Sequence, residues 1–169
     1  MIRRSLLAAT ALVAALTLSS CATFTSHQNV ASVNGAELTR DEFSSMLESE
    51  LGQTLLNSAP VDGFIDGTSA RSLLGAWISI NAITQAGIGA EVDQAEVEQA
   101  LTEEFGPSWT AAPRVVQDLA VHNAIIGQLL ADGAVTSEDL QAVVSDADAT
   151  VDSRYGWWDR ETFTVQPLG

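Results

Sequence analysis

The residue with the clearest chemical role is Cys21, the only cysteine of the chain. It ends the run Leu-Ser-Ser-Cys at positions 18–21, which matches the bacterial lipobox of one aliphatic residue, two small residues and a cysteine. Small side chains let a protease approach the backbone, and a thiol is the nucleophile that accepts a diacylglyceryl group. We therefore expect cleavage before Cys21 and lipid attachment to it. A single cysteine can form no intramolecular disulfide and no cysteine metal site.

The residues before Cys21 have the layout of an export signal. Arg3 and Arg4 precede an apolar stretch from Leu6 to Leu18. A short apolar core after positive charge is typical of a secretory signal, and a spanning helix needs about 20 apolar residues. We predict a signal peptide over 1–20, a tether over 21–29 and one domain over 30–169. The protein is then expected at the outer face of the cell membrane, held by lipid.

Catalytic patterns are lacking in the sequence. His122 lies on the apolar stripe of an expected helix, and no second histidine or paired carboxylate shares its face, so we interpret it as a histidine at the edge of the core. No G-x-S-x-G, H-E-x-x-H or P-loop pattern occurs. We expect no enzymatic activity and no cofactor.

Asp146, Asp148 and Asp152 fall at positions that suggest a calcium loop. The loop would place Val151 where an EF-hand needs glycine and Trp157 where it needs glutamate. We therefore interpret these aspartates as a solvated acidic loop and expect no metal site.

The aromatic segment, residues 154–159 (Arg-Tyr-Gly-Trp-Trp-Asp), is unusual in a chain with only 6% aromatic residues. One interpretation is that its rings pack over the end of the core, which we favour for at least one tryptophan. The other is a hydrophobic surface that binds peptide. The candidate peptide-binding residues of the chain are Trp77, Trp109, Tyr155, Trp157 and Trp158.

Composition indicates one folded, strongly acidic domain. Hydrophobic residues make up 46% of the chain, and about 149 residues remain after the signal peptide. The formal charge of −15 becomes about −17 without Arg3 and Arg4, and the chain has no lysine. Such a surface repels nucleic acid and anionic lipid head groups, so we expect no nucleic-acid partner.

Periodicity and turn signals predict a mainly α fold with about five helices between short strands at the two ends. The expected helices cover 40–55, 69–86, 93–105, 113–131 and 136–144. Thr39 and Glu42 form a capping-box pattern before the first helix. Asn34-Gly35 predicts a tight turn between strands at 30–33 and 36–38. We expect a last strand at 162–166 to pair with the strand near Val30, because an isolated strand needs a partner.

Three stretches resemble the N-terminal chaperone domain of the SurA/PrsA family of extracytoplasmic foldases. Residues 30–43 combine a hydrophobic strand, Asn-Gly, a hydrophobic-Thr helix start and an acidic-Phe pair. Residues 73–97 combine a long apolar helix, a Gly-Ile exit and an acidic helix with Glu-Val, and residues 151–159 are similar to the closing segment of many actinobacterial members. The resemblance implies a trigger-factor-like, peptide-binding fold that joins strands from both ends and cradles unfolded peptide between helices. No parvulin segment is present, so isomerase activity is not implied.

The resemblance and the export signal together predict a membrane-anchored, ATP-independent holdase without prolyl isomerase activity. Its expected partners are unfolded or exported polypeptides, and the membrane through the lipid on Cys21. The alternative is an interaction lipoprotein that binds one dedicated partner in the cell envelope.

Overall fold

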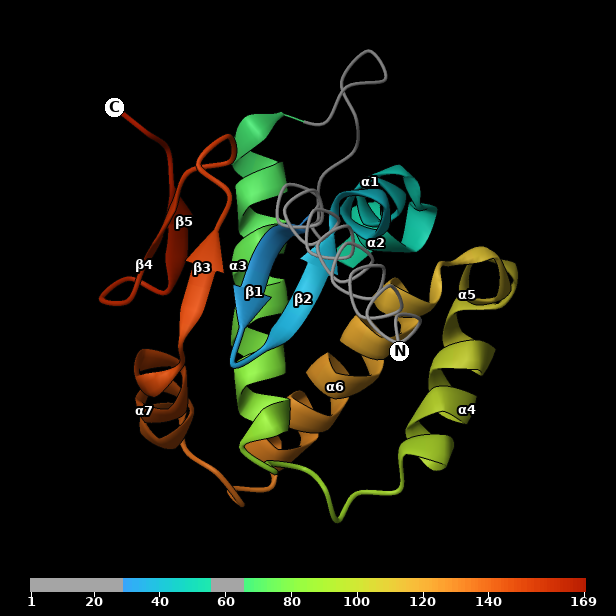
Figure 1. Ribbon diagram of the computed structural model, residues 1–169. Helices are drawn as coiled ribbons and strands as arrows, with labels where there is room; N and C mark the ends of the chain where they lie inside the picture. Colours follow the sequence, from blue (N-terminus) through green and yellow to red (C-terminus); the bar gives the residue numbers. More distant parts are fainter. Residues whose placement is uncertain (1–28, 56–65) are drawn as a thin grey trace, which may run out of the picture.

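The computed structural model describes residues 29–55 and 66–169 of the chain. Cys21, the predicted signal peptide and the predicted tether up to residue 28 lie outside the described residues. Within the described ranges the chain forms seven helices and five short strands (Figure 1). The elements are β1 (Asn29–Val33), β2 (Ala36–Thr39), α1 (Arg40–Glu48), α2 (Glu50–Leu55), α3 (Gly67–Gln85), α4 (Gln94–Phe105), α5 (Pro107–Ala111), α6 (Arg114–Ala131), α7 (Ser137–Asp146), β3 (Ala149–Val151), β4 (Trp157–Asp159) and β5 (Thr164–Gln166). The predicted mainly α fold is confirmed.

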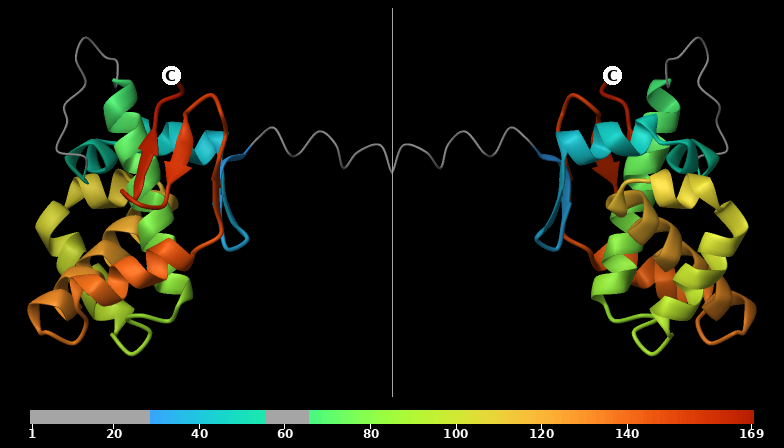
Figure 2. Two further views of the ribbon diagram at one scale, coloured as in Figure 1. Left: turned by 90° about the vertical axis from the view of Figure 1, so that its left-hand side faces the viewer. Right: turned by 90° about the vertical axis from the view of Figure 1, so that its right-hand side faces the viewer.

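The first two strands form the predicted hairpin. Asn34 and Gly35 both have positive φ, 48° and 86°, which is the conformation of a two-residue type I′ turn. Strand β3 pairs antiparallel with the other edge of β1, so the sheet has the order β2-β1-β3. Figure 2 shows this sheet at one side of the molecule, with helices stacked behind it.

The expected pairing of residues 162–166 with the strand near Val30 is wrong. Strand β5 pairs with β4 in a separate hairpin, and β3 takes the place beside β1. The Asn34 amide donates to the Asp148 carbonyl at 2.8 Å, and the Asp148 amide donates to Asn34 Oδ1 at 2.8 Å. These two bonds hold β3 against the turn. Chain from the C-terminal region does reach β1, but it arrives directly after α7. Asn29, which we placed in the tether, already belongs to β1.

The expected helix over 40–55 is divided at Ser49. Its start is as predicted, because the Thr39 amide donates to Glu42 Oε2 at 2.9 Å and the Glu42 amide donates to Thr39 Oγ1 at 3.2 Å. Ser49 is extended, with φ −78° and ψ 139°, and its hydroxyl bonds Met46 O and the Gly52 amide. A Cβ at Gly52 would overlap the Met46 carbonyl oxygen, so this break needs glycine there.

The core lies between the three-stranded sheet and the two long helices α3 and α6. Residues from α1, α3, α6 and the sheet are almost completely buried, among them Phe43, Met46, Leu74, Ile78 and Val116. The described residues thus share one large apolar cluster, to which the sheet and most of the helices contribute.

None of the helices in the described ranges is long and apolar enough to span a bilayer.

Candidate functional site

One hollow of the described surface is a groove of about 340 Å³ beside strand β2, which we call the β2 groove. Its walls come from β2, the first turn of α1, and the facing sides of α3 and α6. Apolar residues form its floor: Ala36, Leu38, Trp77, Ile80, Val115 and Leu119. Polar residues surround the floor: Glu37, Glu42, Asn81, Arg114, Asp118 and His122.

A second, smaller hollow adjoins this floor. It has a volume of about 70 Å³ and shares Ile80 and Leu119 with the β2 groove. Its other lining residues are Leu55, Leu73, Ala76 and Asn123. The apolar floor therefore continues along the seam between α3 and α6 toward the end of α2.

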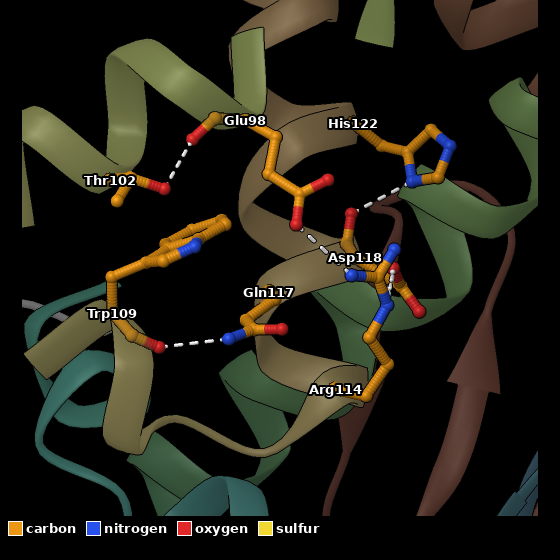
Figure 3. Close-up of polar contacts among 7 residues, drawn as sticks. All are labelled: Glu98, Thr102, Trp109, Arg114, Gln117, Asp118 and His122. Atoms are coloured by element: carbon orange, nitrogen blue, oxygen red, sulfur yellow. Dashed lines mark hydrogen bonds and ion pairs between the residues drawn. The ribbon is translucent and has the colours of Figure 1, made fainter. Parts of the chain in front are cut away.

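A polar network fixes the outer wall of the groove (Figure 3). Arg114 Nη1 lies 3.2 Å from Glu98 Oε1 on α4, and Arg114 Nε lies 2.9 Å from Asp118 Oδ1 on α6. Arg114 is 66% exposed, and exposed ion pairs contribute about 0–1 kcal/mol. The network therefore joins α4 to α6 at the surface but adds little to the stability of the fold.

His122 lies at the rim, half-buried, as predicted for a histidine at the core edge. Its Nδ1 is 2.8 Å from the Asp118 carbonyl oxygen, which can only accept, so Nδ1 carries the hydrogen. The Asp118 carboxylate bonds Arg114 instead of the imidazole. The ring is thus held by the backbone, and the pair lacks the His–carboxylate bond that orients a general base.

The candidate aromatic residues are not brought together. Trp77, Trp109 and Trp158 are 5%, 4% and 8% exposed and belong to the core, whereas Trp157 is 48% exposed. Tyr155 is half-buried, and its ring meets Phe43 edge to face with centroids 5.3 Å apart. Of the five, Trp77 lines the β2 groove. Packing of one tryptophan of the aromatic segment is confirmed by Trp158, and peptide binding by these residues stays a prediction.

The aromatic segment is held by a turn and a close backbone approach. Arg154 Nε donates to Asp152 Oδ1 at 3.0 Å, and the Arg154 hydrogen bonds lower the pKa of Asp152 to about 2. Gly156 has φ +133°, and a Cβ there would overlap the Gln166 carbonyl oxygen across the β4–β5 hairpin. The indole nitrogen of Trp158 is buried with no hydrogen-bond partner in the described region, which costs about 1–3 kcal/mol.

Most groove residues were not singled out in the sequence. Ile80, Val115 and Leu119 read there as ordinary members of apolar helix stripes. The available signal was the polar residues within those stripes, Asn81 on α3 and His122 on α6, because a polar side chain marks where a buried helix face meets solvent. Both residues line the groove.

The fold and the groove define a mainly helical domain with a small antiparallel sheet and an apolar groove with a charged rim. In the described ranges no group of three or more histidine, cysteine, aspartate or glutamate side chains could hold a metal ion. Comparison with known proteins finds no match to a family model, a curated protein or a solved structure. The resemblance to the SurA/PrsA family therefore stays a prediction.

Proposed function

We propose that this protein is a lipid-anchored holdase that binds unfolded or exported polypeptides at the outer face of the membrane. The β2 groove is the observation that carries the proposal. Its floor is apolar and its rim is charged, a combination that accepts hydrophobic side chains while leaving a polypeptide backbone in contact with polar groups. Its volume lies within the range of about 300–1,000 Å³ that is usual for binding sites.

The charge of the protein supports the same proposal. A formal charge of −15 would keep a complex with an aggregation-prone client soluble, because like-charged particles repel one another. The lipobox at 18–21 would place the domain where exported chains emerge.

The proposal is tested by light scattering with a reduced, aggregating client protein. A soluble form that begins at residue 22 retains every residue of the described core. We expect several-fold molar excess of this form to suppress scattering. Undiminished scattering at that excess would reject the holdase function.

A matched pair of variants connects the effect to the groove. Val115 and Val143 are both half-buried on helices, and only Val115 lines the β2 groove. We expect Val115→Gln to weaken suppression several-fold and Val143→Gln to leave it unchanged, with circular dichroism confirming that both variants fold. Equal effects of the two changes on suppression would show that clients do not bind in the β2 groove.

A dedicated interaction lipoprotein is the other outcome. Crosslinking in cells followed by purification separates the two, because one stoichiometric partner favours the dedicated lipoprotein and many substoichiometric clients favour the holdase.

A further inference from the structure

The backbone groups of β2 point alternately toward β1 and away from it. In an antiparallel sheet, successive residues of a strand direct their N–H and C=O groups alternately to the two sides. On the side of β1 that faces β3, the Val30 carbonyl accepts from the Asp152 amide at 2.9 Å. Four residues later, the Asn34 amide donates to the Asp148 carbonyl on the same side. Ala31 and Val33 alternate with these residues, so their backbone groups point to the other side of β1. There they lie opposite Leu38 and Ala36 of β2. Ala36 and Leu38 therefore bond β1.

Glu37 is left with both backbone groups directed away from the sheet. It is exposed, it lines the β2 groove, and the alternation of the ladder directs its N–H and C=O away from β1, to the side of β2 where the described residues pair no further strand. The next amide on this edge, that of Thr39, already donates to Glu42. The open edge of a strand can pair with another extended chain. On β2, the groups available for such pairing are the N–H and C=O of Glu37.

We propose that the client binds as an extended segment that adds antiparallel to the open edge of β2, with one of its residues paired to Glu37. This inference rests on the proposed holdase function and specifies its binding mode. Strand addition provides backbone hydrogen bonds that do not depend on client sequence, while pockets for alternate side chains provide selectivity. The floor of the β2 groove is that set of pockets.

The side-chain pattern of the client follows from the pleat. Side chains opposite one another lie on the same face of a sheet, so the client residue opposite Glu37 points to solvent beside that carboxylate. Its two neighbours point to the face of the half-buried Ala36 and the buried Leu38, toward the apolar floor. The expected client pattern is apolar, basic, apolar.

The rim strengthens the preference for a basic residue. Glu37 and Glu42 both line this end of the groove, and the one arginine in the lining, Arg114, is paired with Glu98 and Asp118. The chain has 22 acidic residues against seven basic ones. A client with lysine at the central position therefore meets a complementary charge.

The experiment measures binding of dye-labelled peptides by fluorescence anisotropy. The peptide has a central Val-Lys-Val, and its matched twin has Val-Glu-Val. We expect the form that begins at residue 22, and the full chain in nanodiscs, to bind the lysine peptide about two- to fivefold more tightly, as for a cross-strand charge pair. Glu37→Gln should remove this preference. Equal affinities for the two peptides in the unmodified protein would overturn the charge part of the inference.

Backbone methylation tests the strand addition itself. N-methylation of the central lysine removes the hydrogen that would bond the Glu37 carbonyl, and we expect about a tenfold loss of affinity. N-methylation of the following valine is the control, because that N–H points away from β2 and its loss should be harmless. Binding should also slow hydrogen exchange of the Glu37 amide.

Two negative results have separate meanings. Equal affinity of both methylated peptides, with no protection of Glu37, would overturn strand addition. Suppression of client aggregation would then still stand, so the proposed holdase function and its binding mode fail independently.

Discussion

The aromatic segment and the β2 groove differ in how well the sequence predicts which residues are exposed. The aromatic segment draws attention in the sequence, yet Trp158 is 8% exposed and Tyr155 packs against Phe43. The groove is less conspicuous in the sequence, where Trp77 is the one candidate binding residue that lines it, yet it collects an apolar floor from three separate parts of the chain. Conspicuous residues here stabilise the fold, and ordinary core residues at the edge of a helix stripe form the hollow surface.

This difference has a physical origin. Large rings lose the most water contact when they are buried, so clustered aromatics are the strongest local contribution to a core. A groove instead forms where packed elements fail to meet. At the β2 groove, β2, α1, α3 and α6 converge, and within residues 29–55 and 66–169 their side chains leave a hollow between them.

The largest expected effect is on the aromatic segment. Trp158→Ala should lower the free energy of unfolding by about 3–5 kcal/mol, as for other buried tryptophans. Trp157→Ala, its neighbour with 48% exposure, should change it by less than about 0.5 kcal/mol. Denaturant unfolding of the two variants gives the comparison. Similar losses would show that Trp157 also carries packing energy, and a loss of client binding in Trp157→Ala would show that the segment binds clients.

A smaller loss of folding stability is expected for a substitution of Gly156. Gly156→Ala introduces a Cβ that overlaps the Gln166 carbonyl oxygen, and we expect a loss of about 1–3 kcal/mol from strain and overpacking. Gly133→Ala is the matched control, since Gly133 also has positive φ, at +69°, but an added Cβ there would meet no atom within 4 Å. In thermal unfolding, the Gly156→Ala variant should have a clearly lower Tm than the Gly133→Ala variant. The reverse order would mean that the β4–β5 hairpin adjusts at little cost.

The smallest effect is the pH dependence of the turn before the aromatic segment. The folded pKa of Asp152 is about 2 and its ordinary value is 3.8, because Arg154 donates to the ionised carboxylate. A lowered folded pKa gives stability that is present above pH 3.8 and is lost as the pH falls toward 2. Asp152→Asn should therefore lose less stability than the unmodified protein over this interval, measured by denaturant unfolding at each pH. Arg154→Gln should flatten the profile in the same way; an unchanged profile in both variants would contradict this role of the pair.

Much of the fold followed from local patterns. Asn34-Gly35 specified the first hairpin, and Thr39 with Glu42 specified the start of α1, because turns and caps depend on residues within three positions of one another. The division at Ser49 was not predicted, because helical spacing continues across it. Strand β3 was not predicted either: three residues, Ala-Thr-Val, become a strand by pairing with β1, where Asp152 bonds Val30 and Asp148 bonds Asn34 in the turn.

The groove was the least predictable part. Its lining combines positions 36–42, 77–81 and 114–122, and no pattern in one segment indicates that these segments converge. Only His122 and Asn81 marked the places where apolar stripes approach solvent.

The sequence by itself determined the mainly helical class, the positions of the long helices, the acidic character, and the lipobox that predicts an anchor at Cys21. These properties depend on composition or on neighbours a few residues apart. Tertiary structure alone decided that β3 pairs with β1, that Trp158 is buried beside an exposed Trp157, and that Glu37 lies on the outer strand of the described sheet, above an apolar floor. Each of these depends on which distant surfaces exclude water from one another, and that is settled only when the elements pack.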